Sequence, residues 1–283
     1  MIIDVIRRIV EKERGKHPLF LRTVIKEALQ DYILYFIYNH QSYRDFIFTG
    51  GTALRKIYGL PRLSEDIDFD STKPFNIQLF ASEILAYFTK NLQYRQVETR
   101  ISGNNRTVFI KFPNLLTEAG LVKNRSNATQ LFVRVDLSIE TLGAYGTEIR
   151  SVTTGEFTFF VKAYDLSTLF TNKIIAFLKR DFFKGKTQMV AFKGRDVFDL
   201  VWFFERREKT GELNPRWERL YKALSLNSKQ EVIQQLTEKI KQLDPSDVRR
   251  DLQPFIPLSQ TTISFSEHFS NILLMSAQSL AAQ

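Results

Sequence analysis

The 283-residue sequence has no cysteine and only three histidines, at positions 17, 40 and 268. The absence of cysteine excludes disulfide bonds, thiolate zinc sites and a cysteine nucleophile. The low number of histidines argues against a histidine-rich metal centre. Any catalytic metal ion must therefore be held by carboxylates. Glycine (12 residues) and proline (8 residues) are also scarce, whereas phenylalanine occurs 25 times. This composition is typical of a packed globular protein, so we expect order almost from end to end.

The sequence also lacks a long apolar run. No stretch approaches the roughly 18 uncharged apolar residues of a membrane span. Residues 1–16 mix charged and apolar side chains, which is not the pattern of a signal peptide. We therefore expect a cytoplasmic protein without a membrane partner.

The two signs of charge are not balanced. The chain carries 40 Lys+Arg against 31 Asp+Glu, a net charge of +9. Such an excess favours polyanionic partners through long-range attraction and counterion release. Basic residues concentrate between 162 and 195, whereas acidic residues cluster at 65–70. This separation suits a site that joins metal ions to a phosphate-rich substrate.

Apolar periodicity divides the chain near residue 163. Before it, helix and strand patterns alternate, and after it the pattern is helical throughout. We predict an α/β (α+β) fold in which a small mixed-sheet domain with N-terminal helices, 1–163, precedes a helical domain, 164–283. The expected helices are 19–39, 52–59, 76–92, 166–180, 195–207, 215–224, 228–243 and 265–280; the expected strands are 46–49, 65–70, 94–101, 106–112, 131–139, 148–152 and 157–161, with a loop at 113–130.

An acidic strand is the first candidate for chemistry. In a strand at 65–70, Asp66, Asp68 and Asp70 point to one face and the apolar residues between them to the other. Neighbouring carboxylates repel one another, and bound cations offset that repulsion. Mg²⁺, or Mn²⁺ in its place, suits such oxygen ligands and completes its shell with substrate phosphates. An exposed edge strand with an acidic stripe is the alternative.

A double glycine precedes this strand. Gly50 and Gly51 follow the strand at 46–49 and open a short helix. A glycine turn at a helix N-terminus lets backbone N–H groups approach a phosphate closely, and the helix dipole adds to the attraction. The hydroxyl of Thr52 can join them. The pattern thus predicts a nucleotide-phosphate site next to the acidic strand.

These motifs resemble a known group of enzymes. A glycine pair after a strand, a short helix and an Asp-x-Asp strand resemble the signature of polymerase-β-like nucleotidyltransferases. More closely, GGTALRKIYGLPRLSEDIDF at 50–69 is similar to the first motif of the AbiEii/AbiGii family of toxins, which includes the MenT-type toxins. The resemblance continues with a lysine helix and then an Arg-Asp-x-x-Asp-Leu helix, here Lys173, Arg195, Asp196, Asp199 and Leu200.

The resemblance implies roles for these residues. Asp66 and Asp68 would hold the metal ions, and Ser64, from the family's Arg-x-Ser-x-Asp pattern, would bond phosphate or water. Arg62 fits either a phosphate contact or an ion pair with an acid beside it. Asp136, in the strand 131–139, is the candidate for a third metal-binding or catalytic carboxylate, because a buried lone carboxylate is costly. A structural pair with Arg134, two residues earlier, is the alternative.

The helical half supplies further candidates. Lys173 lies in an apolar helix, where an ammonium needs a phosphate or carboxylate partner, so we expect it to bind nucleotide and take part in catalysis. Of the two aspartates in the later helix, we favour Asp196 as the catalytic one and expect Asp199 only to cap or pair. The stretch 182–195 carries four basic residues and Phe182, Phe183 and Phe192, which fits either RNA contact or a solvated loop.

The expected activity follows from the resemblance. It implies a magnesium-dependent nucleotidyltransferase toxin of a toxin–antitoxin system, which transfers nucleotides from an NTP to an RNA acceptor, the tRNA 3′ end, releases pyrophosphate and blocks translation. A cognate antitoxin protein would be its partner. Two alternatives remain: nucleotidyl transfer to a protein or small-molecule hydroxyl, and a non-catalytic regulator that binds nucleotide or RNA.

Overall fold

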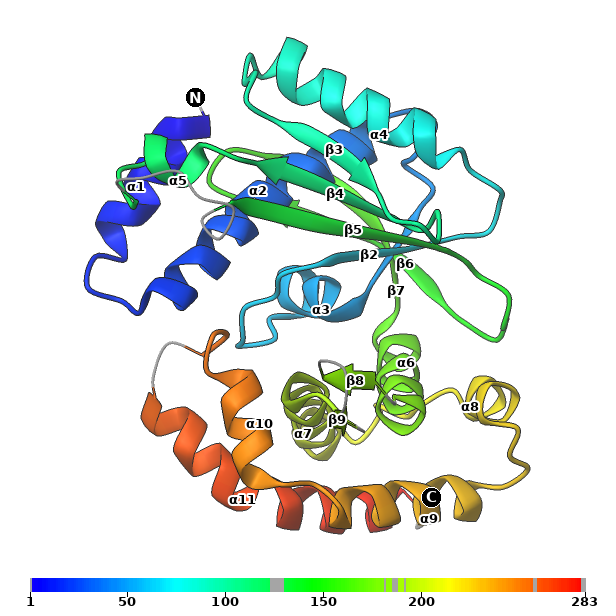
Figure 1. Ribbon diagram of the computed structural model, residues 1–283. Helices are drawn as coiled ribbons and strands as arrows, with labels where there is room; N and C mark the ends of the chain where they lie inside the picture. Colours follow the sequence, from blue (N-terminus) through cyan, green and yellow to red (C-terminus); the bar gives the residue numbers. More distant parts are fainter. Residues whose placement is uncertain are drawn as a thin grey trace. The chain divides into compact units, whose positions relative to one another are not determined.

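The computed structural model describes residues 2–122, 130–180, 182–184, 188–190, 192–256 and 259–280 (Figure 1). The chain divides into two compact units. Unit 1 comprises residues 1–141 and 148–163, and unit 2 comprises residues 142–147 and 164–283. The predicted mixed α/β architecture is confirmed, whereas the division into independent domains at 163 and 164 stays a prediction.

Unit 1 is built on a seven-stranded sheet with the order β3-β4-β5-β2-β1-β7-β6. The central strand pairs are mixed: β1 is antiparallel to β2 and parallel to β7, while β2 is parallel to β5. The strands are β1 (Ile47–Thr49), β2 (Ile67–Ser71), β3 (Glu98–Ile101), β4 (Thr107–Phe112), β5 (Leu131–Ile139), β6 (Thr147–Thr153) and β7 (Thr158–Tyr164).

Helices surround this sheet. Helix α2 begins as its sequence predicts, because His17 caps it by accepting the Leu19 N–H and Pro18 occupies a first-turn position. Helix α3 ends at Gly59, whose φ of 75° is the left-handed conformation that glycine adopts readily. The helices are α1 (Ile2–Lys12), α2 (Pro18–Asn39), α3 (Gly50–Tyr58), α4 (Ile77–Ala86), the π-helix η1 (Tyr87–Asn91) and α5 (Leu115–Glu118).

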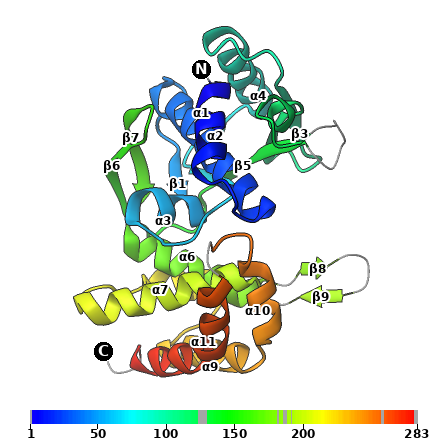
Figure 2. The same cartoon turned by 90° about the vertical axis from the view of Figure 1, so that its left-hand side faces the viewer.

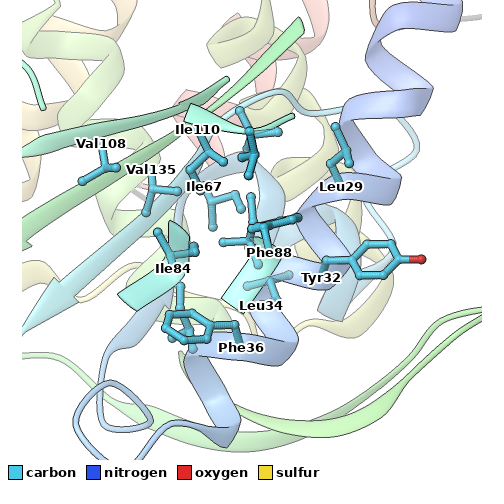
Figure 3. Close-up of a cluster of buried hydrophobic side chains, with 14 of the residues drawn as sticks. Leu29, Tyr32, Leu34, Phe36, Ile67, Ile84, Phe88, Val108, Ile110 and Val135 are labelled. Carbon is cyan, nitrogen blue, oxygen red and sulfur yellow. The ribbon is translucent and has the colours of Figure 1, made fainter. Parts of the chain in front are cut away.

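The core of unit 1 lies between the sheet and the helices α2 and α4. Ile67 of β2 and Val135 of β5 point into it, where they meet Leu29 of α2 and Phe88 of η1 (Figure 3). The alternation of buried and half-buried residues along β2 assigns its aspartates to the opposite face. Burial of the apolar face therefore fixes the direction in which the acidic side chains point.

A buried tyrosine bridges the residue before β1 and strand β7. The Tyr38 hydroxyl lies 3.0 and 2.9 Å from the carbonyl oxygens of Phe46 and Lys162, which share its single donated hydrogen. Burial raises the pKa of Tyr38 well above its usual value, so the hydroxyl stays a donor. This contact holds the entry to β1 against β7.

Unit 2 is helical, with a small hairpin (Figure 2). Phe170 of α6 stacks on Phe203 of α7, with ring centroids 4.8 Å apart, in its core. Arg219 is buried and donates from Nη1 to the Gly143 carbonyl at 2.7 Å, which attaches the segment 142–147 to this unit. The elements are α6 (Leu166–Lys179), β8 (Phe182–Lys184), β9 (Gln188–Val190), α7 (Gly194–Thr210), α8 (Trp217–Leu224), α9 (Lys229–Lys241), α10 (Pro245–Leu252) and α11 (Ser259–Ser279).

Several elements differ from the sequence prediction. Helix α1 was not predicted, although its charged residues share one face and Ile2 and Ile6 are buried on the other. Helix α5 occupies part of the expected loop at 113–130, and β8 and β9 pair within the expected loop at 182–195. Helix α10 was also missed, despite Asp244 as N-cap and Pro245 in its first turn. Within the described ranges, no helix has the length and apolar character to cross a membrane.

Candidate active site

The acidic strand has the two faces that its alternation predicts. Asp68 and Asp70 on β2 are partly exposed, whereas Ile67 and Phe69 are buried. Asp66 directly precedes the strand and is also partly exposed. The carboxylates thus lie, partly exposed, on one face of a strand whose other face is buried in the core.

Strand register brings a distant carboxylate to this face. Asp68 lies opposite Thr49 of β1 on one side and opposite Asp136 of β5 on the other. Because neighbouring strands are about 4.8 Å apart and aligned residues point the same way, the Asp68 and Asp136 side chains emerge side by side. Asp70 is aligned instead with Ser138. The sheet therefore pairs one aspartate of β2 with the carboxylate predicted as the third acid.

Asp136 is also engaged by its neighbours. Its Oδ1 accepts from Thr107 Oγ1 at 2.5 Å and from Arg134 Nε at 3.0 Å, and its Oδ2 is 2.9 Å from Arg134 Nη2. The pair with Arg134 weighed as the alternative is thus present. The Arg134 side chain is 42% exposed, so solvent weakens this pair. A metal-binding role for Asp136 stays a prediction.

The oxygen donors of this face fit a hard divalent cation such as Mg²⁺. Asp68 and Asp136 project from adjacent strands, and Asp66 stands at the start of the same strand. In the conformation described, no three acidic or histidine side chains of the described residues gather closely enough to hold a metal ion.

The double glycine is required by two close approaches. Gly50 has a φ of +77°, and a Cβ at this position would overlap the Asp68 carboxylate. A Cβ on Gly51 would lie 2.9 Å from Arg62 Nη2 and 3.1 Å from Ser64 Oγ. The turn therefore brings the start of α3 directly against the acidic strand and the segment before it.

A Gly50→Ala substitution tests this close approach. We expect it to lower the free energy of unfolding by about 1–2 kcal/mol from the left-handed backbone alone, and to displace the Asp68 carboxylate. Nucleotidyl transfer, the activity that the sequence predicts, should fall more than this loss of stability explains, because the added methyl group occupies the space of that carboxylate. Urea unfolding and initial rates measure the two effects, and Gly103→Ala, where a Cβ meets no atom within 4 Å, is the control.

The Thr52 side chain is fully buried, whereas a residue that contacts a nucleotide phosphate must reach the surface. Its hydroxyl is fully buried, is bonded to the Ser64 hydroxyl with the oxygens 2.9 Å apart, and donates to the Asp66 carbonyl. Ser64 and Arg62 are buried as well, at 7% and 3% exposure. In this structure these three side chains support the turn and the start of β2, and their predicted contact with nucleotide remains untested.

A row of polar residues on α2, to which no sequence motif assigns a role, holds the segment before the acidic strand. Gln30 Nε2 donates to the Ser64 carbonyl at 2.9 Å, and Glu27 Oε1 accepts the Ser64 N–H at 3.1 Å. Lys26 pairs with Glu65 at 2.9 Å. The available signal was that Lys26, Glu27 and Gln30 interrupt the apolar pattern of 19–39 at three- and four-residue spacing, since buried polar groups need partners.

A second charged cluster lies within unit 2. Lys173 Nζ is 2.7 Å from Asp199 Oδ2 and 3.6 Å from Asp196 Oδ1. The other oxygen of Asp196 is 2.8 Å from Arg180 Nε. Both aspartates are buried, and they share one face of α7 because they are three residues apart. Asp199, rather than the favoured Asp196, is therefore the closer partner of Lys173.

Arg195, the first residue of the Arg-Asp pair, is tied to α10. Its backbone N–H donates to Asp251 Oδ2 at 3.0 Å, and its Nε lies 3.4 Å from the same oxygen. Its guanidinium also covers the Phe255 ring at 4.3 Å. These contacts give the arginine a structural role at the start of α7.

Comparisons with known proteins identify the family and the fold. The sequence model of a family described as "Nucleotidyl transferase AbiEii toxin, Type IV TA system" matches residues 33–273. The structure is similar to JHP933 from Helicobacter pylori, with 16% identity, a TM-score of 0.50, and coverage of 92% of this chain and 94% of that one. It is also similar to MenT4, a nucleotidyltransferase toxin from Mycobacterium tuberculosis, with 13% identity, a TM-score of 0.52, and coverage of 99% and 93%. These identities are low, so the two likenesses show the fold alone. No curated protein matches the sequence significantly.

Proposed function

Because the chain belongs to the AbiEii family of nucleotidyl transferase toxins of type IV toxin–antitoxin systems, we propose that it transfers a nucleotide from an NTP to the 3′ end of an RNA. We further propose that the acceptor is tRNA, that the reaction is magnesium-dependent and that the modified tRNA no longer supports translation. The protein acts in the cytoplasm, and a cognate antitoxin restrains it.

The observation that carries the proposal is the alignment of Asp68 with Asp136 beside the Gly50-Gly51 turn. It combines two features that nucleotidyl transfer needs on one surface. Asp68 and Asp136 supply carboxylate oxygens of the kind that a divalent cation prefers, and the amide groups at the start of α3 can face phosphate oxygens. The Thr49 side chain makes no capping bond to these amides.

In the proposed reaction the RNA 3′-hydroxyl attacks the α-phosphorus of the NTP. A new P–O bond forms, the bond from that phosphorus to the bridging oxygen breaks, and pyrophosphate leaves with its electron pair. Asp66, Asp68 and Asp136 would hold the divalent cation, which would polarise phosphate oxygens and favour ionisation of the attacking hydroxyl. The amides of Gly50 and Gly51 hold the departing phosphates. Lys173 and Asp196 stay our predicted catalytic residues of unit 2.

RNA is the acceptor class that the charge favours. The chain carries a net charge of +9, and an RNA strand offers a phosphate at every nucleotide. A protein or small-molecule hydroxyl has no comparable attraction to a basic surface. These two acceptors, and a regulator without catalysis, are the alternatives that the assay must separate.

The deciding assay incubates the purified protein with Mg²⁺, total tRNA and each α-³²P-labelled NTP in turn. We expect label in the tRNA with at least one NTP, and loss of label without the divalent cation. Label in protein instead of tRNA would move the acceptor to a side chain. If the folded protein transfers no label from any of the NTPs to any acceptor, the result would support the non-catalytic regulator.

A further inference from the structure

The face of the sheet that carries Asp136 also carries an aromatic pair. Val108 and Ile110 of β4 point into the core of unit 1 (Figure 3), so Phe109 between them points to the opposite face and is partly exposed. Phe132 of β5 is 39% exposed and packs edge-to-face on Phe109, with ring centroids 5.6 Å apart. Two phenylalanine rings thus lie outside the core, packed against each other.

Basic residues flank this pair. Strand register aligns Phe109 with Arg100 of β3 on one side and with Arg134 of β5 on the other. Aligned residues on neighbouring strands point the same way and are about 4.8 Å apart, so the ring stands between two arginines. Arg100 is exposed, and the Arg134 side chain is 42% exposed. Lys111 lies two residues further along β4 on the same face, opposite Glu98.

Arg134 connects the aromatic pair to the candidate active site. Its Nη2 is 2.9 Å from Asp136 Oδ2, and Asp136 is the next residue of β5 on this face. Asp136 is aligned with Asp68, and Asp68 with Thr49, which directly precedes the glycine turn. In the strand order β4-β5-β2-β1, the aromatic pair and the glycine turn therefore lie on opposite sides of the two carboxylates.

This order suits the geometry of the proposed reaction. In an in-line displacement the attacking oxygen and the leaving oxygen are on opposite sides of the phosphorus. If the glycine turn holds the departing phosphates, the acceptor hydroxyl approaches from the side of β5 and β4. An acceptor strand that ends at the carboxylates then lies over Phe109 and its two arginines.

We propose that Phe109, Arg100 and Arg134 form an RNA platform that binds the single-stranded 3′ end of the acceptor. A base stacks on the Phe109 ring, and the guanidinium groups bind the phosphates beside it. Aromatic side chains on an open sheet face commonly stack unpaired RNA bases, and arginine matches phosphate in geometry. The RNA platform rests on the proposed function for its class of acceptor, and it adds the residues that bind and the requirement for unpaired bases.

The RNA platform is tested first without turnover. Fluorescence anisotropy, in EDTA and without NTP, compares a labelled RNA hairpin that has a single-stranded 3′ overhang with a blunt hairpin of equal nucleotide number. We expect the wild type to bind the overhang RNA at least about fivefold more tightly, the lower end for one stacked base. Phe109→Leu keeps an apolar side chain on the sheet but loses the ring, so it should bind both RNAs equally.

Matched variants separate stacking from a structural role. Phe109→Trp retains an aromatic ring and should keep the preference for the overhang. Phe160→Leu makes the same change at a 68% exposed phenylalanine of β7, on the other side of the carboxylates in the strand order, and should also keep it. An undiminished preference in Phe109→Leu, or none in the wild type, would overturn the proposal.

Arg100 gives a second test that does not depend on packing, because its side chain is exposed. The slope of log K against log [NaCl] for the overhang RNA should fall by about 0.7 in Arg100→Gln, the value for one phosphate of a single strand. An unchanged slope would overturn the phosphate contact.

Steady-state transfer shows which substrate meets the ring. Phe109→Leu should raise the KM for RNA at least about fivefold and leave the KM for the NTP unchanged. A raised KM for the NTP alone would assign the ring to the nucleotide base and overturn the RNA platform. A wild type that prefers the overhang RNA but transfers no label would refute the proposed transfer and keep the RNA platform, so the two failures are distinguishable.

Discussion

Asp68→Asn is expected to lower nucleotidyl transfer by more than about 100-fold, the upper range for residues that only support a metal ligand. Asparagine has nearly the same shape but no charge, so it keeps the strand and removes the anionic oxygen aligned with Asp136. The melting temperature should stay the same or rise, because one of two neighbouring like charges is lost. Label transfer to RNA and thermal unfolding measure the two quantities.

Asp70 provides a matched control on the same strand face. It is partly exposed like Asp68, but its neighbours across the sheet are Ile47 and Ser138 instead of a second carboxylate. Asp70→Asn should therefore keep most of the activity. Equal losses in both variants, or more than a tenth of the wild-type rate in Asp68→Asn, would remove the special role assigned to Asp68.

Asp199→Ala is expected to lower the free energy of unfolding by about 3 kcal/mol, the lower end of the range for breaking a buried ion pair from one side. Asp199 is fully buried and 2.7 Å from Lys173, whose ammonium would keep Asp196, at 3.6 Å, as its acidic partner among the described residues. The Lys173 side chain is 13% exposed, so some water can reach it and limit the loss. Urea unfolding at neutral pH gives the measurement.

A double variant separates stability from activity at this pair. Lys173→Met combined with Asp199→Leu replaces both charges by apolar side chains of similar size, which is often neutral for stability. We expect this variant to unfold near the wild-type urea concentration and yet to be inactive, since the predicted nucleotide contact of Lys173 is gone. Wild-type rates in the refolded double variant would show that the pair serves the fold alone.

The types and spacing of neighbouring residues were sufficient to predict the separate motifs. The alternation in residues 65–70 predicted an acidic face and a buried face, and both are present on β2. The apolar pattern of 19–39 predicted α2 within one residue. These features depend on residues a few positions apart, whose spacing the backbone geometry of a helix or strand fixes by itself.

Tertiary structure decided which of these residues meet. The alignment of Asp68 with Asp136 depends on the register of two parallel strands that are far apart in the sequence. That register is set by packing of Ile67 and Val135 into one core, and no local pattern encodes it. The polar row on α2 is similar, because Gln30 finds its partner at Ser64 only once the helix lies on the sheet.

The Gly50-Gly51 turn shows most clearly which features the sequence determined and which the tertiary structure determined. The sequence by itself determined that Gly50 and Gly51 open a helix after a strand, because their conformational freedom is a local property. Only the folded chain determined why both must lack a side chain: Asp68 fills the space beside Gly50, and Arg62 with Ser64 fills the space beside Gly51. Likewise, the spacing of Asp196 and Asp199 in the sequence placed both on one helical face. The packing of α6 against α7 determined that Asp199 is the closer partner of Lys173. Spacing along the chain fixes which way side chains point, whereas the contacts they make depend on the elements that pack against them.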